Sequence, residues 1–296
     1  MAGLDLRVSS RPEDYKGMEP SKPVFIGVFI ISLWCGFLIM SRCLLLRRAA
    51  TLFIFMIMTK DKDPMGLAIA DFHATGKASK LRLFSPMFYE DEFPVATLFR
   101  DFKDMPVLEQ KAIELASGRI LDVGAGAGCH SLELQRRGAN ITAIDISPSS
   151  VETMRKRGLA HVLEQDFYDV EEKYDTILML MNGIGIVGTL DRMEQFFKQL
   201  DRILAPGGKV LFDSSDICYV FEGEDGIIEL PGTPGYYGEI QYQMQYGRVK
   251  GEQFDWLYID ADTMAEAAFE HGYCFEVIEH GEHYDYLGSL TRKPQV

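Results

Sequence analysis

The sequence predicts an α/β fold: a mostly parallel, seven-stranded sheet with helices on both faces. Two observations support this class. Apolar, strand-like runs alternate with helix-like segments from residue 119 to residue 214, an order that is typical of parallel sheets. The first of these runs enters a turn with glycine at every second position, Gly124, Gly126 and Gly128, and the turn opens a helix. Such a strand–turn–helix unit brings bare backbone close to a ligand and indicates a nucleoside site.

The N-terminal 62 residues form a leader that the sequence leaves open. Residues 23–40 contain no charge and are long enough to span most of a ~30 Å hydrocarbon core. Arg42, Arg47 and Arg48 follow, which would keep that side in the cytoplasm. A single transmembrane helix is one interpretation. The other is a start codon assigned too far upstream, with Met56, Met58 or Met65 as the true start.

Residues 63–118 are predicted to form a helical cap ahead of the core. Helices are expected over 67–75, 93–103 and 106–116, and Pro106 suits a first helical position. We expect these helices to cover the ligand site of the sheet that follows them.

The core domain is expected over residues 119–296. Its predicted strands are 119–124, 140–145, 161–166, 174–180, 208–214, 274–279 and 284–291. Its predicted helices are 129–137, 148–157, 190–203 and 261–271. Two alternating runs, 239–246 and 254–260, predict an antiparallel hairpin inserted after the fifth strand, within residues 217–260. This insertion lies near the carboxyl edge of the sheet, where ligands bind, so we expect it to contact the substrate.

Three acids, Asp122, Asp145 and Asp166, close three successive predicted strands. The Asp145 carboxylate suits the two hydroxyls of a ribose. The glycine spacing G-x-G-x-G differs from the G-x-G-x-x-G that seats a pyrophosphate. Asp122 stands two positions before the first glycine, where it would repel a pyrophosphate but suits a ligand with an ammonium and a sulfonium. The pattern therefore favours S-adenosyl-L-methionine (SAM).

These motifs resemble those of the class I SAM-dependent methyltransferases, whose fold is Rossmann-like. The motifs are residues 120–128, 141–146, 164–167, 174–182 and 204–212. The resemblance covers residues 100–216 firmly. It implies that the glycine turn and Asp122 hold the methionine moiety, Asp145 the ribose, and Asp166 with Phe167 the adenine. The cofactor-binding residues it implies are Asp122, Gly124, Ala125, Gly126, Gly128, Asp145, Ile146, Asp166, Phe167 and Met181.

Candidates for catalysis and substrate binding are fewer. Asn182 follows the fourth strand, where its amide would orient a methyl acceptor, with a plain turn residue as the alternative. Tyr236 and Tyr237 in the insertion, and Tyr89 in the cap, are the candidates for walls of a substrate pocket. His130 is expected to pack or cap near the cofactor rather than act as a base.

The predicted function is methyl transfer from SAM to a small molecule by in-line displacement, by a cytoplasmic catalytic domain. An NAD(P)-dependent oxidoreductase on the same fold and a non-catalytic SAM-binding module are the alternatives. A net charge of −17 over residues 59–296 disfavours nucleic acid as a partner. The five cysteines have no metal-binding spacing, so no metal is expected. Membrane contact is expected only if residues 23–40 are an anchor; the acceptor atom and the oligomeric state stay open.

Overall fold

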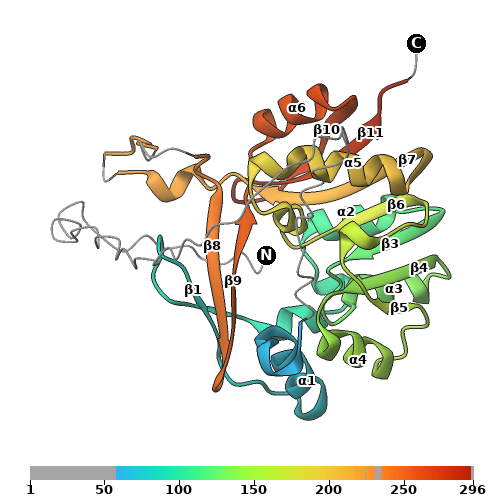
Figure 1. Cartoon of the computed structure of the whole chain (residues 1–296), viewed down its shortest axis with the longest axis vertical. Coiled ribbons are helices and arrows are strands. Elements are labelled where there is room, and N and C mark those ends of the chain that lie inside the picture. Colours follow the sequence, from blue (N-terminus) through green and yellow to red (C-terminus); the bar gives the residue numbers. More distant parts are fainter. Residues whose placement is uncertain (1–57, 224, 231–234, 295–296) are drawn as a thin grey trace, which may run out of the picture. The chain divides into compact units, whose positions relative to one another are not determined.

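The computed structural model describes residues 58–223, 225–230 and 235–294, whose strands form two sheets (Figure 1). The larger sheet has seven strands in the order β10-β11-β7-β6-β3-β4-β5. Its strands are β3 (Arg119–Val123), β4 (Asn140–Asp145), β5 (Val162–Glu164), β6 (Tyr174–Met179), β7 (Leu204–Ser215), β10 (Tyr273–His280) and β11 (Asp285–Arg292). Strands β3 to β7 run parallel, and β11 is antiparallel to both of its neighbours. The predicted seven-stranded, mostly parallel sheet is confirmed.

Helices cover both faces of this sheet because consecutive strand residues point to opposite sides. In β3, Ile120 packs in the cluster formed with α2 (Val107–Leu115), α3 (Cys129–Arg136) and α4 (Pro148–Lys156). The next residue, Leu121, packs in the cluster formed with α5 and α6. Those two helices span Met193–Ile203 and Ala261–Glu270.

The smaller sheet corrects the prediction of an all-helical cap. Its four antiparallel strands, in the order β2-β1-β8-β9, are β1 (Leu81–Phe84), β2 (Asp91–Phe93), β8 (Glu239–Tyr246) and β9 (Val249–Leu257). The hairpin β8–β9 is the predicted insertion, but β1 and β2 come from the predicted cap. The prediction of a helix over 93–103 is wrong as well. The chain forms two short 3₁₀ segments there, Val95–Phe99 and Phe102–Asp104.

The four-stranded sheet packs against the turn that follows β6. Trp256 of β9 lies on Gly185 in the 3₁₀ segment Gly183–Val187, and a Cβ on Gly185 would come within 2.1 Å of the Trp256 Nε1 atom. Because β6 ends at the carboxyl edge of the large sheet, this contact sets the insertion at that edge.

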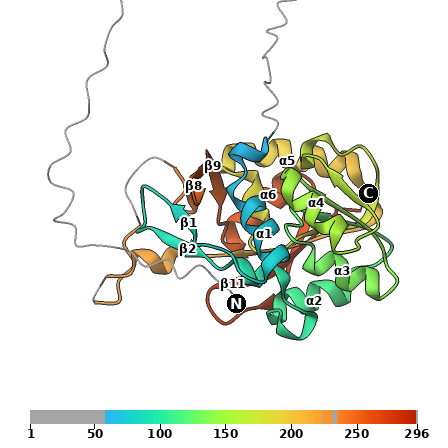
Figure 2. The same cartoon turned by 90° about the horizontal axis from the view of Figure 1, so that it is seen from below.

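Helix α1 (Pro64–Thr75) lies between the four-stranded sheet and α4 (Figure 2). Asp63 caps it: Oδ1 accepts a hydrogen bond from the Gly66 amide at 2.8 Å. The other oxygen, Oδ2, accepts one from Ser147 Oγ at 2.7 Å, and Ser147 Oγ in turn accepts from the Ser150 amide at the start of α4. One buried carboxylate therefore joins the starts of two helices.

Both interpretations of the leader concern residues that lie almost entirely outside the described ranges, including residues 23–40. Over the parts of the chain that the structure describes, no helix combines the length and the apolarity that a membrane span requires.

The Gly185–Trp256 contact predicts a size-dependent effect on stability. Gly185→Ala forces the indole or the turn to move, so we expect the free energy of unfolding to fall by about 1–3 kcal/mol in urea titrations. In a Trp256→Phe background the same change meets a smaller ring, and the loss should be clearly smaller. An equal loss in both backgrounds would contradict this packing.

Candidate active site

The glycine turn leaves the backbone exposed at Gly124, at the end of β3. Gly124, Gly126 and Gly128 have φ angles of 66°, 58° and 80°, in the left-handed region that favours glycine. A Cβ on Gly124 would meet no atom within 4 Å, so the backbone there is bare on the side where a ligand approaches. Helix α3 starts directly after Gly128 and points its first amides toward this turn.

Asp145, the last residue of β4, is bonded directly to the glycine turn. Its Oδ2 accepts the Gly126 amide and its Oδ1 accepts the Ser147 amide, each at 2.8 Å. Burial raises the pKa of Asp145 to about 6, against the opposite effect of the two amides. Each carboxylate oxygen keeps a further lone pair, which is the acceptor set that two ribose hydroxyls need.

Asp122 lies beneath the turn, in β3. It is 2% exposed, and its Oδ2 accepts a hydrogen bond from Ser131 Oγ of α3 at 2.6 Å. Burial raises the pKa of Asp122, while the charge of His130 and the Ser131 hydrogen bond lower it. Its carboxylate thus ties the strand before the turn to the helix after it.

Asp166 and Phe167, the two residues predicted to lie at the adenine, differ in how far they are exposed. Asp166 is exposed beyond β5, with Oδ1 accepting the Tyr168 amide at 2.8 Å. Phe167 is 4% exposed, and its ring packs 5.9 Å from that of Phe196 in the core. The Phe167 ring is thus buried under α5, and the contact of Phe167 with an adenine stays a prediction. Ile146, 49% exposed next to Asp145, offers apolar surface instead.

Two consecutive residues after β6 are held in a strained conformation. Met181 and Asn182 have φ angles of 67° and 56°, which are uncommon for residues with a side chain. Asn182 Oδ1 accepts a hydrogen bond from Ser215 Oγ at 3.2 Å, which orients the amide and directs its NH₂ group to other partners. Strain of this kind concentrates at functional sites, and this turn lies at the same carboxyl edge as Asp122 and Asp145.

Asp213, near the end of β7, is a site residue that was not predicted from the sequence. Its Oδ1 accepts the Gly183 amide at 3.4 Å, beside Asn182. Burial and repulsion by Glu109 raise the pKa of Asp213 to about 7, against the Gly183 amide and the charge of His130. The available signal was an acid at the end of the fifth predicted strand, the same pattern that identified Asp122 and Asp145.

The tyrosine candidates differ in their surroundings. The Tyr236 hydroxyl donates to Asp260 Oδ2 at 2.5 Å, the Tyr237 hydroxyl donates to Asp216 Oδ1 at 2.7 Å, and the two rings lie 4.6 Å apart. Both are partly buried beside β8. Tyr89 is 61% exposed in the β1–β2 connection.

His130 packs near the turn, as expected, within an ionic cluster that the sequence did not reveal. Its Nε2 lies 2.7 Å from Glu109 Oε2, and Arg100 Nη2 donates to the other oxygen of Glu109. Although burial opposes the charged ring, the Cys129 thiol and Glu109 raise the pKa of His130 well above its usual value. Within the described ranges, no group of three or more His, Cys, Asp or Glu side chains has the arrangement of a metal site.

Comparison with known proteins agrees with this geometry. Residues 120–208 match the family model described as a methyltransferase domain. Ubiquinone biosynthesis O-methyltransferases of Xanthomonas oryzae pv. oryzae (strain PXO99A) and Xylella fastidiosa (strain 9a5c) are 32% and 40% identical over 108 and 106 residues. Each match covers 34% of this chain, which spans only 45% and 43% of the length of these two curated relatives.

A solved SAM-dependent methyltransferase from Bacteroides fragilis, in complex with S-adenosyl-L-homocysteine, is 50% identical. The match covers 80% of this chain and 98% of that protein, with a TM-score of 0.76. The CcbJ methyltransferase from Streptomyces caelestis shares the fold at 12% identity and a TM-score of 0.51, over 79% of this chain and 99% of its own. The chain therefore belongs to the class I SAM-dependent methyltransferase family, and its cofactor is S-adenosyl-L-methionine.

Proposed function

We propose that this protein transfers a methyl group from SAM to a small-molecule acceptor by in-line displacement, with residues 119–296 as its catalytic domain. One observation carries the proposal: Asp145 at the end of β4 accepts the Gly126 amide of the turn after β3, and the backbone of that turn is open at Gly124. This arrangement fits a ribose beside Asp145 and a methionine moiety over Gly124 and Gly126. Bound SAM supplies a methyl group that the sulfonium has already activated.

Around that anchor, other residues would complete the cofactor site. The exposed Ile146 side chain would cover one face of the adenine, and the exposed Asp166 carboxylate would lie at its polar edge. The buried Phe167 side chain would contribute only indirectly, by packing in the core beneath Asp166. Met181, in the strained turn after β6, would adjoin the methionine moiety.

The methyl acceptor would contact the inner face of the four-stranded sheet, which is the face turned toward the turn that follows β6. Ile240 pairs with Trp256 and Tyr242 with Phe254, so the four side chains share one face. This face is aromatic and packs on the turn that contains Gly185. Tyr236 and Tyr237 flank it. Ile240 and Tyr242 are buried, so an acceptor with an aromatic or apolar body would contact the partly exposed rings of Phe254 and Trp256.

The named relatives suggest where a search for the acceptor should begin. The two curated relatives named above are ubiquinone biosynthesis O-methyltransferases. Aromatic compounds with a free ring hydroxyl are therefore the first acceptors to screen.

The chain's own contribution to chemistry would be positioning, which is worth about 7–11 kcal/mol when donor and acceptor are aligned. The NH₂ group of Asn182, oriented by Ser215, would hold the acceptor atom. Asp213 is bonded to the adjacent Gly183 amide, and its pKa near 7 suits a group that takes the proton of a hydroxyl acceptor.

The pKa of Asp145 predicts the pH dependence of cofactor binding. Below about pH 6 this carboxyl takes up a proton and loses acceptor capacity, so SAM affinity should fall as the pH falls from 7 to 5. The dissociation constant should rise by up to about tenfold per pH unit in calorimetric titrations of the full chain.

Two variants control that experiment. Asp145→Asn should bind SAM weakly and with little dependence on pH over the same interval. Asp169→Asn, which changes an exposed acid beyond β5, should keep both the affinity and its pH dependence. Wild-type binding that does not change between pH 5 and 7 would contradict the role of Asp145.

A substitution at Asn182 distinguishes a methyltransferase from a protein that only binds SAM. Asn182→Gly keeps the positive φ angle accessible, so we expect SAM affinity to stay within about threefold of the wild type. Turnover of an acceptor found in the ring-hydroxyl screen should fall about 10- to 100-fold, because one oriented hydrogen bond is lost. Unchanged turnover would remove Asn182 from the catalytic machinery.

A further inference from the structure

Trp256 of β9 presents a hydrogen-bond donor beside the turn that follows β6. Its indole Nε1 makes no hydrogen bond to any residue that the structure describes. The side chain is partly exposed, so a ligand can reach it. A tryptophan N–H group usually finds a partner when it is buried, and one without a partner is unfavourable. A molecule that covers this indole therefore has to supply an acceptor atom.

The indole lies close to Asn182. Its five-membered ring packs on Gly185, and Nε1, Cε2 and Cδ1 are the three atoms nearest to where a Cβ on Gly185 would stand. The Gly185 amide donates to the Asn182 carbonyl at 2.9 Å, which closes one 3₁₀ turn between these two residues. One such turn rises about 6 Å. The Trp256 N–H group and the Asn182 amide are therefore neighbouring donors at the carboxyl edge of the large sheet.

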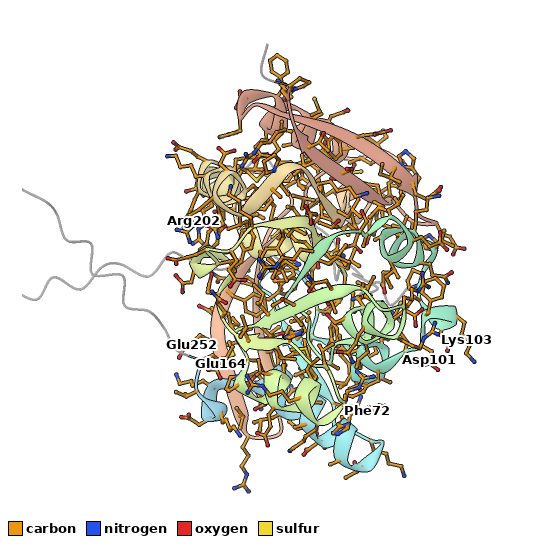
Figure 3. The ribbon with its side chains drawn as sticks, turned by 90° about the vertical axis from the view of Figure 1, so that its right-hand side faces the viewer. Phe72, Asp101, Lys103, Glu164, Arg202 and Glu252 are labelled. Atoms are coloured by element: carbon orange, nitrogen blue, oxygen red, sulfur yellow. The ribbon has the colours of Figure 1, made fainter. Side chains whose placement is uncertain are left out.

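The indole is held on a strand whose position is fixed on both sides of it. The ring of Phe254 meets it edge to face, with the centroids 6.1 Å apart and an angle of 84° between the planes. Asp255, its neighbour in β9, lies 3.8 Å from Arg192, just before α5. Strand β9 runs inward from the exposed Glu252, which lies at the edge of the molecule in Figure 3. The donor is thus placed by a sheet rather than by a loop.

Two donors in this arrangement restrict what the methyl acceptor must carry. The oxygen held by the Asn182 NH₂ group is the one that is methylated in the proposed function. An oxygen on the neighbouring ring position can accept from Trp256, because two hydrogen bonds of about 2.9 Å reach it from donors about 6 Å apart. An alkyl group at that position would cover the N–H group without accepting from it, which is unfavourable.

We propose that Trp256 is a specificity-determining residue whose indole N–H group selects acceptors with a second oxygen beside the hydroxyl that is methylated. The inference rests on the proposed function, since the ring-hydroxyl acceptor and its contact with Asn182 come from there. It narrows the acceptor class to aromatic hydroxyl compounds that have an oxygen substituent on the neighbouring ring position.

The test compares two acceptors of nearly equal size, 2-methoxyphenol and 2-ethylphenol. The first has an ether oxygen where the second has a methylene group. Methyl transfer from SAM to each acceptor is measured with the full chain as kcat/KM. The wild type should prefer 2-methoxyphenol by about 3- to 10-fold, the value of one hydrogen bond between neutral groups. Because this ratio compares two acceptors with the same enzyme, the folded fraction of the protein does not affect it.

Two variants assign the preference to the N–H group. Trp256→Phe keeps an aromatic ring but loses the donor, so the ratio should fall to within about twofold of one, while the SAM dissociation constant stays within about threefold of the wild type. Phe254→Leu is the matched control, since Phe254 contacts the indole and has no donor. It should change kcat/KM for both acceptors by the same factor and keep the wild-type ratio.

The inference is overturned if the wild type methylates both acceptors equally well or prefers 2-ethylphenol. A Trp256→Phe enzyme that keeps the wild-type ratio overturns it as well, because the preference then comes from another group. Methyl transfer occurs in both cases, so the proposed function remains. If the wild type binds SAM but methylates neither compound, the ring-hydroxyl acceptor class fails together with this inference. If the wild type binds no SAM, the proposed function itself fails.

Discussion

The hydrogen bond from the Gly126 amide to the Asp145 carboxylate is the contact on which the site depends. It joins the turn after β3 to the end of β4 at 2.8 Å, and it exists because parallel neighbouring strands end at the same edge of a sheet. The turn reaches this carboxylate only through left-handed backbone at its glycines. Ligand hydroxyls that donate to this half-buried carboxylate would stabilise its charged form further.

The same carboxylate links the site to the N-terminal part of the described chain. Asp145 accepts the Ser147 amide, the Ser147 hydroxyl donates to Asp63, and Asp63 caps α1. Farther along α1, Asp71 accepts a hydrogen bond from the Tyr246 hydroxyl of β8 at 2.8 Å. A continuous set of polar contacts and one helix therefore connect the cofactor side of the site to the sheet proposed to hold the acceptor.

The strands of the large sheet could be predicted from the sequence, whereas two strands of the small sheet, β1 and β2, could not. The difference has a physical reason. Strands such as β3 and β6 are signalled by local patterns: apolar runs, a glycine turn, and acids at the strand ends. Strand β1 pairs with β8, far along the chain, and its four residues contain only two inward apolar positions, Leu81 and Leu83. Such a pattern is too short to distinguish a strand from a helix.

Similar limits apply within the site. The places of Asp122, Asp145 and Asn182 were predictable because each lies at or near the end of a strand that the sequence predicts. Arg100 and Glu109 were not, because an acid and a base in predicted helices normally indicate a solvated surface. Only the fold shows that they are buried together beside His130. The burial of Phe167 likewise depends on α5, which no local pattern places over it.

A crystal structure of the full chain with S-adenosyl-L-homocysteine tests the central claim most directly. The account predicts ribose hydroxyls on the Asp145 carboxylate and the amino-acid moiety over Gly124 and Gly126; a cofactor bound without contact to Asp145 would contradict it.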